Sequence, residues 1–452
     1  MLGRGLRAEV PRSSHAVWDP PAGRTDPVER LTSDSVGRIP ELVPLRNGRM
    51  LTSAFSFFRG SASVMAADLA STPSTGLQVQ LCGDAHLSNF GGYASPERRL
   101  VFDLNDFDET IPGPWEWDLK RLATSLEVAG RDRGFDDRDR RHVVQSACAA
   151  YRQAMREFAQ MSMLQVWYSR LGADDVRDRW ADQAGAKAAR KFDRQVEKAM
   201  TKDSARAAER LTQLVDGRAR ITSDPPLVVP AADLMTSEEF SQFDRIVTDT
   251  LRSYRRTLPA STRHLLEQFR YGDVARKVVG VGSVGTRTWA LLMTGLDQEP
   301  LMLQLKEATD SALAPFTGKT RFRNEGQRVV VGQQLLQASS DVFLGWTRSL
   351  ALDGQQHDFY VRQLWDWKIS ADVENQSPAT MAIYGQICGW TLARGHACSG
   401  DRCAIAAYLG RGDVFDLAVG DFARAYAEQN EADYGRLVQA ARDGRIEMTR
   451  EA

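Results

Sequence analysis

The chain has 452 residues, of which 42% are hydrophobic and 26% are charged, values typical of a soluble globular protein. Its length predicts two or three domains. The net charge of -1 excludes a global attraction to nucleic acid or a membrane surface, so any phosphate-binding field must be local. The five cysteines form no CxxC pair, and neither a membrane-spanning apolar run nor a signal peptide is visible. We therefore expect a cytoplasmic protein without a membrane span or a nucleic acid partner.

The first quarter of the chain predicts a flexible arm followed by helices and short strands. Residues 1–40 are rich in Arg, Pro, Ser and Asp, which is typical of a loose N-terminal arm. Apolar residues at helical spacing follow over 41–75. Two short strands, at 77–81 and 100–104, precede a helix that begins at Trp115.

The rest of the chain separates into two helical regions around a β-rich one. Residues 131–265 are charged and helical, and we expect them to be an insertion on the acceptor side. Residues 266–370 contain short strands rich in Val, Leu and aromatic residues, with one helix near 323–338. Residues 371–452 return to helix. The sequence therefore predicts an α+β protein with a small antiparallel sheet lobe, and a mainly helical lobe formed by 41–130 and 371–452.

The loop at 83–90 carries the first candidate site. Asp84 and Asn89 lie five positions apart on it. A phosphoryl-transfer site needs a carboxylate to orient a hydroxyl, and an amide with a carboxylate to hold magnesium. We predict that Asp84 orients the acceptor and that Asn89 binds Mg²⁺, with His86 as a structural hydrogen-bonding residue. The alternative is a turn capped by the Asp and Asn side chains.

A second acidic cluster follows the strand at 100–104. Asp103, Asp106 and Asp108 alternate along the chain, so we expect them to share one face of an extended segment. Clustered carboxylates repel each other unless a cation compensates. We predict that Asp106 is the magnesium carboxylate, assisted by Asp108 or Asp103. Asp118 is predicted to brace the loop at 83–90 by accepting backbone hydrogen bonds.

A glycine-rich stretch lies almost two hundred residues later. Gly280, Gly282 and Gly285 match GxGxxG, and Ser283 lies within this motif. A helix would follow the last glycine in a dinucleotide-binding fold, but residues 286–293 are strand-like. A strand, a Gly-rich loop and a second strand form the phosphate cover of kinases. An ordinary hairpin turn is the alternative.

The next strand ends in Lys306. A lysine in an apolar strand is costly unless it meets an anion, so we predict that Lys306 binds the nucleotide phosphates. Glu325 on the following helix is its predicted partner. The alternatives are a lysine that reaches solvent and a solvated glutamate. Leu364 begins the predicted hinge near adenine, over 364–367.

Three arginines near the first acidic loop are interleaved with aromatic residues. Arg46, Arg49 and Arg59 could bind phosphate or pair with acids. We favour pairing with acids.

These motifs carry two resemblances. Residues from about 25 to 445 resemble the bacterial family catalogued as domain of unknown function 2252. The motifs concerned are RNGRM, FRG, GDAHLSNFG, FDLNDFDETIPGPWEWDLKRLA, VVGVGSVGTR, QLKEA and DFYVRQLWDWK.

The segment around Asp84 also resembles aminoglycoside and choline phosphotransferases of the protein-kinase-like superfamily, whose pattern is Gly-Asp with an Asn five residues after that Asp. Cys82 departs from this pattern, since His is usual there, and Lys120 stands where Ala is usual after Asp-Leu. Kinases place the Gly-rich loop and lysine before the catalytic loop, whereas here they follow it. The resemblance therefore implies a circularly permuted kinase-like fold, in which residues 384–396 match the helix before the catalytic loop.

Together the motifs and the resemblance imply an ATP- and Mg²⁺-dependent phosphotransferase acting on a hydroxyl of an unidentified acceptor. Three alternatives stay open. The same fold could transfer AMP, or it could bind nucleotide without catalysis. Asp84 and His86 also fit the Asp-x-His motif of a metallophosphoesterase, although the chain lacks the Gly-Asn-His-Glu/Asp stretch of such enzymes.

Overall fold

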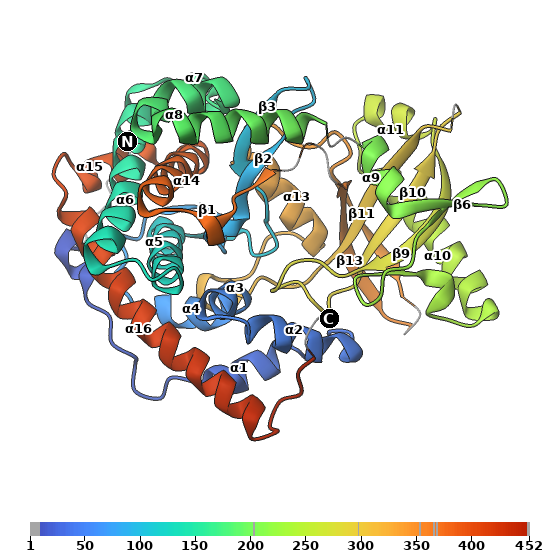
Figure 1. Cartoon of the computed structure of the whole chain (residues 1–452), viewed down its shortest axis with the longest axis horizontal. Helices are drawn as coiled ribbons and strands as arrows, with labels where there is room; N and C mark the ends of the chain where they lie inside the picture. The colour runs from blue at the N-terminus through green and yellow to red at the C-terminus, as the bar shows by residue number, and fades with distance from the viewer. Residues whose placement is uncertain are drawn as a thin grey trace.

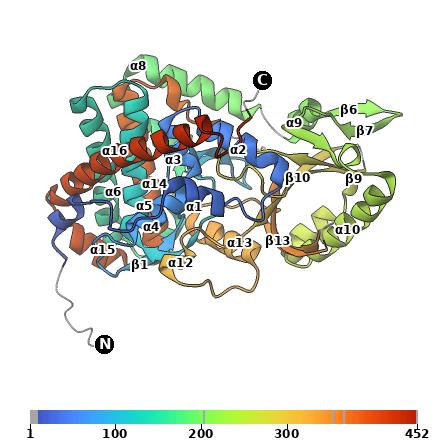
Figure 2. The ribbon, with the colours of Figure 1, turned by 90° about the horizontal axis from the view of Figure 1, so that it is seen from below.

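The structure is a computed structural model that describes residues 10–201, 204–296, 298–351, 354–364, 367 and 369–449. It is an α+β protein in which a β-rich lobe lies beside a larger, mainly helical lobe (Figure 1). Figure 2 shows the same two parts from below, with α16 crossing the helical lobe. In the part of the chain described, no helix is both long enough and apolar enough to cross a membrane.

The β-rich lobe is built on an antiparallel sheet of six strands in the order β12-β13-β11-β10-β9-β8. Side chains alternate between the two faces of each strand. Leu303 and Leu305 of β11 pack with α10 on one face. Gln304 and Lys306 therefore point to the other face, toward the helical lobe. The strands are β8 (Val228–Pro230), β9 (Arg270–Lys277), β10 (Thr288–Thr294), β11 (Pro300–Ala308), β12 (Gly345–Leu350) and β13 (Gln356–Gln363).

The helical lobe is centred on α6 and α14, which pack along each other. Gly389 of α14 permits this packing, since a Cβ there would lie 2.3 Å from the carbonyl oxygen of Ala147 in α6. The helices of this lobe are α1 (Pro27–Ser33), α2 (Val43–Met50), α3 (Ala54–Gly60), α4 (Ala62–Leu69), α5 (Trp115–Asp132), α6 (Asp137–Gln160), α7 (Met163–Tyr168), α8 (Ala173–Met200), α14 (Pro378–Ser399), α15 (Arg402–Leu409) and α16 (Val414–Arg442).

The remaining helices belong to the sheet lobe or to its junction with the helical lobe. Helix α13 contacts β12 and β13 on one side and α14 on the other, so it joins the two lobes. These helices are α9 (Ser204–Leu211), α10 (Ser237–Arg255), α11 (Ala260–Leu266), α12 (Ala314–Thr317) and α13 (Glu325–Leu336).

Small sheets position the two acidic loops. The loop after β1 and the loop after β3 lie side by side, because the Asn105 amide donates to the Asn89 carbonyl at 2.8 Å. The strands involved are β1 (Gln78–Leu81), paired with β4 (Ile111–Pro114), and β2 (Phe90–Ala94) and β3 (Leu100–Leu104), flanked by β14 (Ile369–Ser370) and β5 (Leu171–Gly172). A separate hairpin pairs β6 (Thr212–Val215) with β7 (Arg218–Ile221).

Several sequence predictions are confirmed at this level. The strand expected at 100–104 is β3, and the helix that starts at Trp115 is α5. The C-terminal end of α14 lies against the strand before the first acidic loop, as the Gln80 amide donates to Ser399 Oγ at 3.1 Å. Two segments more than three hundred residues apart in sequence therefore meet at this loop.

Other predictions were wrong. Residues 1–9 lie outside the described residues, but the rest of the expected arm is packed, since Arg24 bonds both Asp68 and Asp433 at 2.8 and 2.9 Å. Residues 131–265 are not one insertion. Helix α6 belongs to the core of the helical lobe, whereas α10 covers the sheet and β8 extends it.

Candidate active site between the two lobes

The first acidic loop is held rigidly at its base. Asp118 of α5 accepts hydrogen bonds from the backbone amides of Cys82 and Gly83 at 2.8 and 3.0 Å. His396 of α14 contacts the same carboxylate at 3.2 Å. Gly83 has φ +86°, and a Cβ there would lie 2.3 Å from the Glu109 carbonyl oxygen. The bracing role predicted for Asp118 is confirmed, and the position before Asp84 requires glycine.

Asp84 projects into a cavity beside the sheet lobe. Its Oδ1 receives hydrogen bonds from Arg121 of α5, at 2.8 Å from Nε and 2.7 Å from Nη2. Its Oδ2 lies 3.6 Å from His86 Nε2. Burial raises the pKa of Asp84, and the charge of Arg121 opposes that rise. Since Arg121 engages only one oxygen, the other is available to a group in the cavity.

His86 and Asn89 complete the loop. His86 Nδ1 accepts the Ser88 amide at 3.2 Å, and burial lowers the pKa of His86 well below its ordinary value, which makes it a neutral hydrogen-bonding residue. Asn89 donates through Nδ2 to the Asp84 carbonyl at 2.7 Å. The donor end of the Asn89 amide is therefore committed, and its oxygen is the end that can bind a cation.

Lys306 meets the second acidic cluster across the junction between the lobes. Its Nζ forms an ion pair with Asp108 and lies 3.7 Å from Asp106 Oδ2. Tyr360 donates to Asp108 Oδ1 at 2.9 Å. Burial and repulsion by Asp108 raise the pKa of Asp106. Burial also disfavours ionised Asp108, but Lys306 and the Tyr360 hydroxyl lower its pKa overall. Lys306 thus compensates the negative charge of Asp106 and Asp108, which lie about two hundred residues before it in the sequence.

Two residues predicted to belong to the site, Asp103 and Glu325, have other partners. Asp103 does not line the cavity. Its carboxylate accepts hydrogen bonds from the backbone amides of Leu104 and Ala338 at 2.9 and 2.8 Å. It does not share a face with Asp106 and Asp108, because β3 ends at Leu104 and the strand alternation ends with it. Glu325 does not pair with Lys306. It forms an ion pair with Arg328, one turn along α13.

The Gly-rich loop lies over this cluster. Gly280 and Gly285 have φ of +63° and +91°, a conformation that favours glycine. Ser283 Oγ donates to Asp108 Oδ2 at 3.2 Å. Arg38 donates to the carbonyls of Gly282 and Val284 at 2.9 and 2.7 Å, which fixes the loop to the helical lobe.

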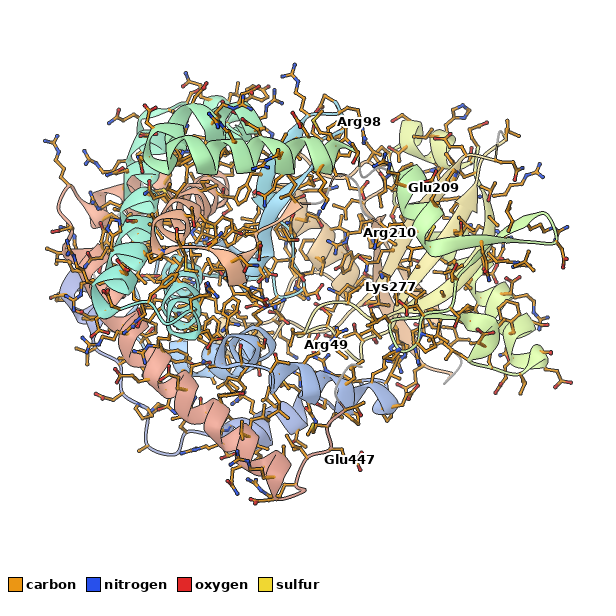
Figure 3. All side chains as sticks on the ribbon, in the orientation of Figure 1. Arg49, Arg98, Glu209, Arg210, Lys277 and Glu447 are labelled. Carbon is orange, nitrogen blue, oxygen red and sulfur yellow. The ribbon has the colours of Figure 1, made fainter. Side chains whose placement is uncertain are left out.

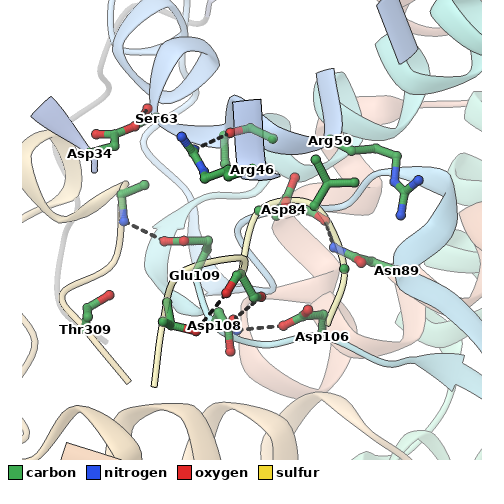
Figure 4. A pocket seen from close by; sticks show the side chains of 18 of the residues that line it. Asp34, Arg46, Arg59, Ser63, Asp84, Asn89, Asp106, Asp108, Glu109 and Thr309 are labelled. Carbon is green, nitrogen blue, oxygen red and sulfur yellow. Dashed lines mark hydrogen bonds between the residues drawn. The ribbon is translucent and has the colours of Figure 1, made fainter. Parts of the chain in front are cut away.

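Two cavities lie on either side of the acidic cluster. The first, of about 260 Å³, is lined by Asp84, Asn89, Asp106, Asp108 and the Gly-rich loop from Gly280 to Ser283. Figure 4 shows these acids converging in it. The described part of residues 131–265, which we expected on the acceptor side, does not line this cavity.

The second cavity, of about 280 Å³, lies between the sheet, α13 and the β2–β3 hairpin. Leu364 lines it, as does Gln304 from β11. Residues 365 and 366 of the predicted hinge lie outside the described residues. Figure 3 places Arg98 and Lys277 along the boundary between the lobes.

Sequence reasoning missed Arg362. This residue of β13 donates to Gln304 Oε1 at 3.0 Å and to the Asn105 carbonyl at 3.1 Å, next to Asp106. It stands opposite Gln304 in the register of β11 and β13. A signal was present in the sequence, since Tyr360 and Arg362 alternate with the apolar residues Phe359 and Val361.

Two of the three arginines near the first acidic loop do not pair with acids as expected. Among the described residues, Arg46 and Arg59 have no acid within ion-pair distance, and both line the first cavity. Arg49 donates to the Gly280 carbonyl. The preferred prediction of acid pairing is therefore wrong for Arg46 and Arg59.

The donor set fits a magnesium ion shared with a phosphate ligand. Within the described residues, no group of three or more His, Cys, Asp and Glu side chains has the arrangement of a metal site. Mg²⁺ is usually held by one or two carboxylates with substrate phosphates and water. Asp106, Asp108 and the Asn89 oxygen, facing one cavity, meet that requirement.

The fold and site define an α+β protein whose inter-lobe cleft joins a Gly-rich loop, a buried lysine and paired carboxylates. A family model described as an uncharacterized protein conserved in bacteria (DUF2252) matches residues 38–440. The chain belongs to this bacterial family. Neither the curated proteins nor the solved structures contain a match.

Proposed function

We propose that this protein is an ATP- and Mg²⁺-dependent phosphotransferase that acts on a hydroxyl group of its acceptor. The observation that carries the proposal is the ion pairing of Lys306 with Asp106 and Asp108, two carboxylates that line one cavity together with Asp84. A buried cation, paired carboxylates, a glycine-rich cover and a hydroxyl-orienting acid are the parts that phosphoryl transfer requires.

The order of elements in the sheet lobe supports a kinase-like arrangement. A Gly-rich loop joins β9 to β10, the lysine lies on the next strand, β11, and helix α13 follows. Protein kinases carry their phosphate cover and their lysine on the corresponding first three strands. Circular permutation accounts for the chain order, because α14 follows the sheet lobe and ends beside β1, which leads to Asp84.

The residues divide the chemistry between them. Gly280, Gly282 and Gly285 cover the phosphates, and Ser283 and Lys306 bind them. Asn89, Asp106 and Asp108 hold Mg²⁺, which would neutralise charge on the phosphates. Asp84 orients the acceptor hydroxyl, and the Arg121 contact fixes the carboxylate for this task. The base and ribose occupy the second cavity, bordered by Leu364 and Arg362.

Incubation with labelled ATP, Mg²⁺ and a panel of hydroxyl compounds tests the proposal. Wild type should transfer label to an acceptor, and Asp84→Asn should bind nucleotide but transfer nothing. Label in the γ-phosphate separates phosphoryl transfer from AMP transfer, which requires label in the α-phosphate. Hydrolysis of a phosphate ester with a divalent metal but without ATP would instead indicate a metallophosphoesterase.

A further inference from the structure

The first cavity contains a group of hydrogen-bond donors that the proposed reaction leaves unused. They lie where α2, α3 and α4 border the cavity, next to Asp84. The donors are the N-terminus of α4, at Ala62 and Ser63, and the side chains of Arg46 and Arg59.

The N-terminus of α4 is open to this cavity. The helix begins at Ala62, and its cap residue Ser61 makes no side-chain capping hydrogen bond. Within the described residues, nothing accepts the backbone N–H of Ala62 or Ser63. Free amides and the helix dipole at an N-terminus favour an anion.

Arg46 supplies a second, independent observation. It is 1% exposed and donates through Nη2 to the Gly60 carbonyl at 2.9 Å. Its Nε and Nη1 are buried and have no hydrogen-bond partner in the described part of the protein. Burial lowers the pKa of Arg46 to about 9, so its guanidinium stays charged at neutral pH. A buried cation with unused donors is costly unless an anion compensates it.

Arg59 approaches the same place from α3. Its Nε is buried without a partner, and its guanidinium lies over the Phe55 ring at 6.0 Å. Figure 4 draws Arg46 and Arg59 on the two sides of Asp84, with Asp34 and Ser63 beyond Arg46. Arg46 and the helix terminus therefore lie together on one side of the hydroxyl-orienting acid, and Arg59 lies on its other side.

The acids of this cavity are engaged elsewhere. Asp84 is bonded to Arg121, Asp108 is bonded to Lys306, and Asp34 accepts from the Ser63 hydroxyl. Glu109 accepts from the Ala312 amide, and burial raises its pKa to about 7. Arg46 and Arg59 thus form no ion pair within the described residues, although the charge of Asp34 acts on Arg46 and that of Asp84 acts on Arg59.

We infer that the acceptor is an anionic hydroxyl compound whose phosphate or carboxylate group binds the N-terminus of α4 beside Arg46, with Arg59 on the far side of Asp84. This inference rests on the proposed function and specifies its acceptor class. The acceptor hydroxyl then faces Asp84. Its oxygen forms a bond to the γ-phosphorus of ATP, the bond from that phosphorus to the bridging oxygen breaks, ADP leaves, and the hydroxyl proton passes by way of Asp84 to water.

Calorimetric titration with inorganic phosphate, in the presence of saturating Mg·ADP, tests this assignment. Each charge-assisted hydrogen bond is worth about 1.5–3 kcal/mol, or roughly 10- to 100-fold in affinity. Arg46→Gln should weaken phosphate binding by at least about tenfold and Arg59→Gln should weaken it less, with Mg·ADP affinity within about twofold of wild type in both variants. Arg138→Gln, on the exposed face of α6, is the matched control and should change neither. Malonate replaces phosphate in a second arm, to distinguish a phosphate ester from a carboxylate.

Three outcomes would overturn the inference. Phosphate and malonate binding could both be unchanged in the arginine variants, or the variants could lose Mg·ADP affinity, which would assign these arginines to the nucleotide. Loss of phosphate binding in Lys306→Met alone would likewise place the anion on the sheet side. Thermal unfolding confirms that each variant is folded. If Arg46→Gln is not folded, Arg46→Lys decides the question, because it keeps the charge but loses the planar guanidinium and should still weaken phosphate binding. The proposed function fails separately, if wild type does not bind Mg·ADP.

Discussion

Replacing Lys306 with methionine tests the ion pair that joins the two lobes. Lys306 is 1% exposed, whereas the side chains of Asp106 and Asp108 are 32% and 26% exposed. Methionine fills a similar volume but leaves the two carboxylates without their principal cation. Removal of one partner from a fully buried ion pair costs about 3–5 kcal/mol.

The expected loss is smaller here because both carboxylates are partly solvated at the cavity. Tyr360 and Arg362 also continue to stabilise them. We therefore expect Lys306→Met to lower the free energy of unfolding by about 2–3 kcal/mol at pH 8. Burial and Asp108 already raise the pKa of Asp106, and loss of the opposing Lys306 charge should raise it further above its unfolded value. Folding then favours the protonated acid, so the loss should shrink as the pH falls to 5.

Urea-induced unfolding, followed by the fluorescence of the ten tryptophans, measures this effect. The double variant Lys306→Met/Asp108→Asn removes one of the exposed charges and should recover about 1 kcal/mol relative to Lys306→Met. A loss below about 0.5 kcal/mol that is the same at pH 5 and pH 8 would refute the reasoning.

Further predictions concern the loop, the acceptor and a buried lysine. Asp84→Asn should keep Mg·ADP affinity within about twofold while transfer falls by at least about 100-fold, and unchanged turnover would disprove the assigned role. Gly83→Ala should cost about 2–4 kcal/mol, because its Cβ would clash with the Glu109 backbone. Gly23→Ala has a similar φ of +82° without any close neighbour, and should cost only about 1 kcal/mol, so equal losses in urea unfolding would contradict the clash. Burial lowers the pKa of Lys120 from 10.5 to about 7, which penalises its charged form. Wild-type stability should therefore rise from pH 7 toward 10.5, and Lys120→Met should gain about 2–4 kcal/mol at pH 6 but little at pH 10, whereas a gain independent of pH would exclude this cause.

Local patterns predicted the elements and several contacts of the site correctly. Strand alternation with a single lysine in an apolar run indicated that Lys306 meets an anion, and the structure pairs it with Asp106 and Asp108. The position of Asp118 at the start of a helix after the acidic loops indicated a brace, and its two backbone hydrogen bonds are present. The first prediction depended on the energetic cost of an unpaired buried charge, and the second on the position of Asp118 along the chain.

Local sequence patterns could not predict which of several available partners a side chain contacts. Glu325 had a distant lysine and a nearby Arg328 available, and the local pair formed. Asp103 was expected to continue an alternation that ends with β3 at Leu104. The assignment of 131–265 failed for a related reason, since amphipathic helices look alike in sequence whether they cover a sheet, as α10 does, or other helices, as α6 does.

The central claim is that two halves of the chain, distant in sequence, form one site for nucleotide and magnesium. Calorimetric titration with Mg·ADP of wild type, Lys306→Met and Asp106→Asn tests it most directly, with Arg138→Gln as control. The account predicts binding by wild type and by the control, and affinity at least about tenfold weaker in each of the other two variants. Absence of binding by wild type, or equal affinity in all four proteins, would contradict it.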